Sequence, residues 1–131
     1  MKFLLTIYSD ESGWTNASPE DVQRIMEAYG AFGQAAQDAG VLLGGEGLQP
    51  TSTATTVRVR DAETITTDGP FAETREQLGG YYLLDCKDLD EATRWAAKIP
   101  DATGGAVEVR PVMDYEAMGA GQPDEAGQAQ G

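Results

Sequence analysis

The apolar residues of this chain follow two different spacings along its length. In six stretches they alternate with polar residues or run together over a few positions, as in β-strands; these stretches are 3–8, 41–44, 53–60, 64–67, 80–86 and 107–113. In two longer stretches, 18–40 and 88–99, they recur every three or four positions, as on an amphipathic helix. The polar stretch 9–17, between the first strand and the first helix, is expected to be a loop. We therefore expect an α+β chain in the order β-α-β, a β-hairpin and a second β-α-β, with an antiparallel sheet and both helices on one face.

Both expected helices carry start and stop signals. Ser18 stands before a proline and two acidic residues, which is typical of a helix N-terminus. Asp88 and Glu91 have the spacing of a capping box for the second helix. Gly40 is a natural end for the first helix, and Pro100 stops the second. These local signals predict where each helix begins and ends.

One face of the expected sheet has no cover within the chain. Two helices can cover only one face, yet the first strand and the strand at 80–86 carry apolar residues on both faces. A second copy of the same sheet is the simplest way to cover this face, so we expect a homodimer. In the hairpin, Val57 and Val59 alternate with Arg58 and Arg60, and the return strand is rich in threonine. This pattern favours a position at the edge of the sheet.

Charge and composition narrow the classes of function. With 9 basic and 22 acidic residues the net charge is −13, so neither nucleic acid nor an anionic membrane surface is an expected partner. No stretch approaches the ~20 apolar residues of a membrane span. Histidine is absent from the sequence, which removes the usual imidazole base and His-based metal sites, and we expect no metal or cofactor. The single cysteine, Cys86, indicates a buried thiol in a reducing compartment and hence a cytoplasmic protein.

The chain of 131 residues is expected to form one domain over 1–114, followed by a tail at 115–131. A domain of this size buries enough surface to fold without a disulfide or a metal. The tail is acidic and rich in glycine, alanine and glutamine, and such a composition cannot build a core. We therefore expect the tail to be disordered.

The densest set of candidate site residues lies at an Asp-Gly-Pro-Phe turn, residues 68–71, and in the charged segment after it. The Gly-Pro pair breaks the preceding strand, and one short helical turn over 71–77 is expected after it. Asp68 is the candidate catalytic group, a general acid/base in a pocket at the sheet end. Its alternative is an Asx turn, in which the carboxylate accepts from a backbone N–H. Phe71 and Arg75 are candidate ligand-binding residues, Arg75 as an anion contact unless neighbouring glutamates neutralise it.

A glycine-rich run supplies another candidate. Glu46 stands among Gly44, Gly45 and Gly47, where backbones approach closely or a strand bulges. Glu46 is therefore a candidate ligand-binding residue at the edge of a site, and the alternative is that the run forms a solvated hairpin or bulge. The run lacks the Lys-Ser/Thr end of a phosphate-binding loop, so it is not interpreted as one.

These segments together resemble the DGPF-domain branch of the YCII-related family. The resemblance extends over about residues 1–113 and is carried by the turn at 68–71, by Glu73 and by the segments 1–8, 10–11, 28–29, 40–42, 44–50, 76–80, 90–92, 95–96 and 107–112. It implies a ferredoxin-like α+β domain that pairs as a dimeric α/β barrel, and no settled activity. Related members pair a histidine with an aspartate; Asp68 matches the aspartate, and the histidine has no counterpart here. Tyr29 is the candidate substitute, with a core aromatic whose hydroxyl reaches the surface as its alternative.

Three functions remain open at this point. The first, which we adopt, is a small-ligand-binding or regulatory accessory module whose partners are a second copy and a small molecule; the resemblance adds a possible association with sigma factors. The second is a small cofactor-free enzyme that uses Asp68 as its acid/base. The third is a structural dimer with no ligand.

Overall fold

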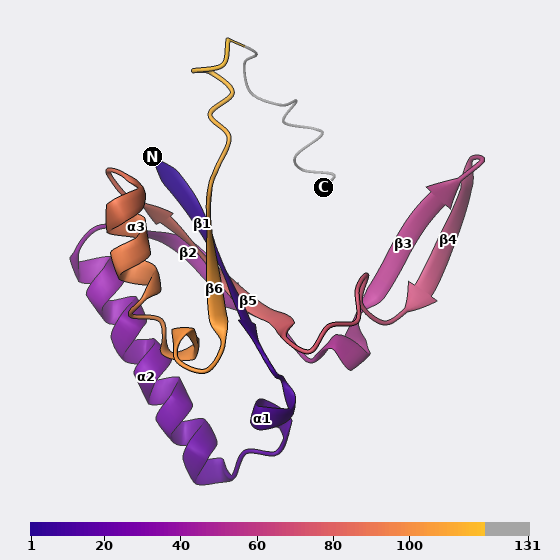
Figure 1. Cartoon of the computed structure of the whole chain (residues 1–131), viewed down its shortest axis with the longest axis horizontal. Coiled ribbons are helices and arrows are strands. Elements are labelled where there is room, and N and C mark those ends of the chain that lie inside the picture. The colour runs from indigo at the N-terminus through magenta and orange to yellow at the C-terminus, as the bar shows by residue number, and fades with distance from the viewer. Residues whose placement is uncertain (120–131) are drawn as a thin grey trace.

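Four antiparallel strands form the main sheet, in the order β2-β5-β1-β6. The structure is a computed structural model and describes residues 1–119. The four strands are β1 (Lys2–Ser9), β2 (Leu42–Gly47), β5 (Gln77–Asp85) and β6 (Ala106–Pro111). The two long helices, α2 (Pro19–Asp38) and α3 (Leu89–Ala96), both lie on one side of this sheet (Figure 1). The predicted α+β architecture, with an antiparallel sheet and two helices on one face, is confirmed, and it is consistent with a ferredoxin-like fold.

The hydrophobic core lies between the sheet and these helices. Phe3 and Leu5 of β1 and Leu84 of β5 are fully buried. Phe32 of α2 packs against them, with its ring centroid 5.9 Å from that of Trp95 on α3. β1 is paired on both edges and buries every second side chain, so it is a central strand of the sheet. Cys86 is 2% exposed, so the predicted buried thiol is confirmed as well.

The predicted helix caps are present. The Ser18 hydroxyl oxygen accepts a hydrogen bond from the amide of Asp21 at 3.1 Å, and Asp88 accepts one from the amide of Glu91 at 2.9 Å. Gly40, just beyond α2, has φ +75°, a conformation that glycine adopts without strain. These residues act on backbone groups within four positions, which is why local sequence was sufficient to predict them.

Two local predictions are wrong. Residues 12–15 form a short helix, α1 (Ser12–Thr15), where a loop was expected, because the Asp10 carboxylate accepts hydrogen bonds from both the amide and the hydroxyl of Ser12. Residues 71–77 contain no helical turn. Instead, the Thr74 hydroxyl donates to the Glu76 carbonyl, and the side chain of Gln77 donates to the Thr74 carbonyl at 2.5 Å. These bonds hold the segment in bends rather than in a helix.

The hairpin forms a separate two-stranded sheet, and its predicted place at the edge of the main sheet is wrong. Its strands are β3 (Thr55–Arg60) and β4 (Glu63–Asp68), preceded by the 3₁₀ turn η1 (Thr51–Thr53). Asp61 and Ala62, at the tip, both have positive φ, as in the tight turns that suit hairpins. The hairpin extends away from the sheet on the side opposite α2 and α3 (Figure 1).

The side of the main sheet that faces away from the helices is called the open face below. It carries alternate residues of the strands, among them Leu4, Thr6, Tyr8, Tyr81 and Leu83, and these five are half-buried. None of the helices within residues 1–119 is long and apolar enough to cross a membrane. Of the tail predicted at 115–131, residues 115–119 form turns, and residues 120–131 lie outside the described part of the chain.

Candidate functional site

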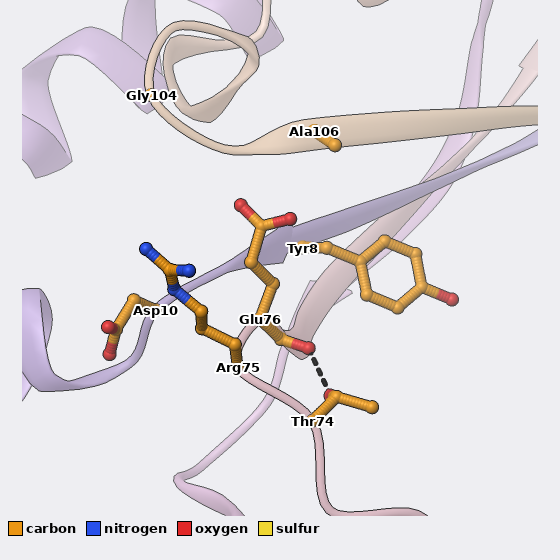
Figure 2. Close-up of a pocket in the computed structure, with 7 residues that line it drawn as sticks. All are labelled: Tyr8, Asp10, Thr74, Arg75, Glu76, Gly104 and Ala106. Atoms are coloured by element: carbon orange, nitrogen blue, oxygen red, sulfur yellow. Dashed lines mark hydrogen bonds between the residues drawn. The ribbon is translucent and has the colours of Figure 1, made fainter.

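Two open cavities lie at the end of the sheet where β1 finishes and β5 begins, on either side of residues 74–77. The first has a volume of about 600 Å³ and is lined by Tyr8, Asp10, Thr74, Arg75, Glu76, Gly104 and Ala106 (Figure 2). The second has a volume of about 430 Å³ and is lined by Glu11, Thr51, Ser52, Gly69, Pro70, Ala72, Glu73, Thr74 and Gln77. Thr74 belongs to both linings, so the segment 74–77 is their common wall.

Strand register assembles the first cavity from distant parts of the chain. Tyr8 pairs with Ala106 of β6 on one side and with Leu78 of β5 on the other, next to a register shift in β1. Gly105 permits this arrangement, because a Cβ there would lie 2.3 Å from the Tyr8 carbonyl oxygen and 2.8 Å from that of Asp101. A residue with a side chain would push the start of β6 away from β1 and open the cavity wall.

Arg75 supplies the positive charge of the first cavity. Its guanidinium lies between the carboxylates of Asp10 and Glu76, and both Arg75 and Glu76 extend toward the start of β6 (Figure 2). Within residues 1–119 Arg75 forms no ion pair within 4.0 Å, so the expected neutralisation by neighbouring glutamates is not formed. Hydrogen bonds from Ser12 lower the pKa of Asp10 below its usual value, and the charge of Arg75 adds a smaller effect in the same direction.

Glu11 ties together the walls of the second cavity. Its carboxylate accepts hydrogen bonds from both the amide, at 3.0 Å, and the hydroxyl of Thr51, while its own amide donates to the side-chain oxygen of Gln77 at 2.9 Å. One residue thus joins the end of β1, the base of the hairpin and the start of β5. Sequence reasoning gave Glu11 no role; the only signal was an acidic pair directly after a strand.

The predicted catalytic group, Asp68, lies outside both cavities. It is the last residue of β4, pairs with Thr55 and is exposed, so it does not lie in the pocket that was expected around it at the sheet end. No hydrogen bond to its carboxylate is formed within residues 1–119, and the Asx-turn alternative is therefore not formed either. Phe71 is 75% exposed, with the guanidinium of Arg58 5.0 Å from its ring centre. The Asp-Gly-Pro-Phe turn reaches the second cavity through Gly69 and Pro70 rather than through either candidate side chain.

Tyr29 is held on the helix side of the sheet. Its hydroxyl donates to the Asp101 carboxylate at 2.5 Å, and its ring packs against the core. Burial, reinforced by the hydrogen bond and charge of Asp101, raises the pKa of Tyr29 well above its usual value. This placement matches the alternative of a core aromatic with its hydroxyl near the surface.

Glu46 is exposed and lies opposite Tyr81 on the open face. The close backbone approach predicted around it is confirmed: a Cβ on Gly45 would lie 2.6 Å from the Tyr81 carbonyl oxygen, and one on Gly80 would lie 2.9 Å from that of Glu46. A register shift between Leu42 and Gly44 supplies the predicted bulge. The structure therefore places Arg75 in a cavity and leaves the other four candidates, Asp68, Tyr29, Glu46 and Phe71, apart from it.

Comparisons with known proteins agree with the fold and name no reaction. Residues 1–116 match the YCII-related domain family. An uncharacterised protein of Rhizobium meliloti (strain 1021), R00369, is 42% identical to the chain over 118 residues, which cover 88% of this chain and 95% of that protein. The family match spans the sheet, the helices, the hairpin and the first cavity. The chain belongs to the YCII-related domain family.

Proposed function

We propose that this protein is a small-ligand-binding accessory module and that its ligand occupies the cavity at Arg75. The observation that carries the proposal is a guanidinium without an ion-pair partner among residues 1–119, at the wall of a cavity of about 600 Å³. Cavities of roughly 300–1,000 Å³ are the usual size of small-molecule sites. The cavity combines this cation with hydroxyl groups and carboxylates from two separate segments, 8–10 and 74–76, which is suited to orienting a polar molecule.

The charges around Arg75 favour a particular class of ligand. A planar guanidinium binds a carboxylate through two parallel hydrogen bonds. Asp10 and Glu76 flank it, and they would repel a multiply charged anion while accepting hydrogen bonds from ligand hydroxyl or amino groups. The ligand we propose is therefore a small molecule with one carboxylate and at least one hydrogen-bond donor.

We also propose that two copies pair through their open faces as a dimeric α/β barrel in the cytoplasm. Leu4 and Leu83 are apolar residues that lie opposite each other in the β1–β5 register, on the face that the helices of residues 1–119 leave uncovered. A second sheet would remove this surface from water, which is favourable in proportion to the apolar area buried. A regulatory link to sigma factors rests on the family resemblance alone and would act through this dimer.

A thermal-shift screen of hydroxy and amino acids tests the ligand proposal. At a ligand concentration of about 100 times its dissociation constant, binding adds about 2.7 kcal/mol to the free energy of unfolding. The wild type should be stabilised, Arg75→Gln should lose the effect, and Arg94→Gln, a matched change in the last turn of α3, should keep it. Stabilisation that survives Arg75→Gln, or no stabilising compound in the panel, would contradict the proposal.

A further inference from the structure

The hairpin at residues 55–68, called the arm below, is amphipathic but has no core of its own. Directly opposed residues of an antiparallel pair share a face. Val57 opposes Thr66 and Val59 opposes Thr64, so these four residues form one face, called the valine face. Val57 and Val59 are each 59% exposed. Alternation of this kind is typical of a strand with one covered face, yet nothing within residues 1–119 covers it.

The opposite face of the arm is suited to water. It carries Arg58 and Arg60, with Ile65 opposite Arg58 and Glu63 opposite Arg60, and Thr67 lies on the same face two positions after Ile65. Arg58 also covers one side of the Phe71 ring. Charged side chains on this face and valines on the other indicate that the valine face is the one that becomes buried. An isolated two-stranded hairpin is only marginally stable in water, so the arm needs a surface to pack against.

The position of the arm indicates where that surface lies. The arm extends on the side of the sheet opposite α2 and α3, which is the side of the open face (Figure 1). A second copy seated on the open face would therefore lie next to the arm. In a twofold-symmetric pair each copy would receive the other's arm, because such an interface uses the same surface on both partners.

The area of the open face supports the same conclusion. Four strands about 4.8 Å apart, each with about six residues rising ~3.3 Å, span roughly 19 by 20 Å, a projected area of about 380 Å². A face of the arm would add roughly 200 Å² to this projected area, so the arm enlarges the surface that each copy can offer to the other.

We propose that the valine face of the arm packs on a second copy of this chain, next to that copy's open face. The inference rests on the dimer of the proposed function and adds to it the region of the chain that completes the interface. The apolar stripe of Val57 and Val59 would be removed from water there, while Arg58 and Arg60 would stay solvated.

Sedimentation of two matched double variants tests the arm. Val57→Lys with Val59→Lys places two charges on the valine face, and Ile65→Lys with Thr67→Lys places two on the opposite face. Both changes reduce the net negative charge equally, so repulsion between copies falls equally in each. The first variant should raise the dimer dissociation constant at least about tenfold, and the second by less than about twofold. Circular dichroism of both variants checks that the sheet and helices remain folded.

The outcomes separate the arm from the dimer. Leu83→Lys on the open face serves as the reference change that should dissociate the pair. If Leu83→Lys dissociates the copies and the valine-face variant does not, or if both arm variants weaken the dimer equally, the arm inference is overturned and open-face pairing stands. A wild type that sediments as a single chain at micromolar concentration would overturn both, and ligand binding at Arg75 would still be judged by the thermal-shift screen.

Discussion

Replacing Gly45 by alanine should destabilise the fold, whereas the same change at the neighbouring Gly44 should not. A Cβ on Gly45 would lie 2.6 Å from the Tyr81 carbonyl oxygen and 2.6 Å from a ring carbon of Tyr82, and no atom lies within 4 Å of a Cβ built on Gly44. The carbonyl belongs to the β2–β5 ladder and cannot rotate away as a side chain can. Relieving this contact requires β2 to move outward along part of its length.

The size of the difference follows from two opposing effects. Overpacking a fixed backbone costs about 1–3 kcal/mol, and glycine to alanine returns about 0.4–1 kcal/mol by restricting the unfolded chain. Gly45→Ala should therefore lose about 1–2 kcal/mol of unfolding free energy, and Gly44→Ala should gain up to about 1 kcal/mol. For a chain of this length the gap of about 2 kcal/mol corresponds to about 7 °C in melting temperature.

Urea unfolding followed by tryptophan fluorescence would measure both variants. Wild type and variants should be compared at one protein concentration, because association of copies adds to apparent stability. If Gly45→Ala and Gly44→Ala have equal unfolding free energies, β2 does not approach β5 as closely as described, and the reasoning about this edge of the sheet is refuted.

Two further predictions concern groups whose pKa is raised by folding. Tyr29→Phe removes the hydrogen bond to Asp101 and should lower the free energy of unfolding by about 1 kcal/mol at pH 8. Because folding raises the pKa of Tyr29 from 10.0, the free energy of unfolding of the wild type should fall as the pH rises above 10. Urea unfolding at pH 8 and at pH 10.5 should show a smaller fall for Tyr29→Phe than for the wild type. An equal fall in both proteins would contradict the assigned environment. Burial raises the pKa of the Cys86 thiol, and the charges of nearby carboxylates reinforce the shift. A thiol reagent should therefore react at least about a hundredfold more slowly with the native protein than with the protein unfolded in urea. Rapid reaction of the native protein would show that the thiol is accessible.

Residues that act locally were predictable from the sequence. Ser18 and Asp88 cap their helices by accepting a hydrogen bond from the amide three positions later in the chain. Phe3 and Leu5 are buried while the residues next to them are less buried, which is the alternation expected of a strand with one face in the core. The hydrogen bonds from Ser12 to the Asp10 carboxylate, which hold the start of the short helix α1, are local in the same way. The polar composition of residues 9–17 nevertheless favoured the prediction of a loop.

The separate position of the hairpin could not be predicted from its own residues. Val57 alternates with Arg58 in the same way whether its face is covered by this chain or by another. Local alternation predicts that a face is buried and carries no information about what buries it. The sequence pattern of the arm therefore predicted an edge strand of the main sheet, and only the tertiary structure shows that the arm is a separate sheet.

The candidate site was predictable only in part for a related reason. Arg75 could be singled out as an anion contact from its charge and its place after a turn. Tyr8 and Ala106 are 98 positions apart and meet through the register of β1 with β6, which no local pattern specifies. Asp68 lies in a strongly marked turn, yet it lines neither cavity, because the strand that it ends belongs to the arm.

The common wall formed by residues 74–77 has a consequence for how two paired copies would respond to ligand. Thr74 borders both cavities, and Gln77 is fastened through Glu11 to the turn from which the arm departs. A molecule that displaces this wall from the Arg75 side would also shift the base of the arm. Such coupling is reciprocal. When the neighbouring copy holds the arm, the affinity of the Arg75 cavity for its ligand would therefore change as well. Uptake by one copy would then change uptake by the other, and the saturation curve would depart from a simple hyperbola.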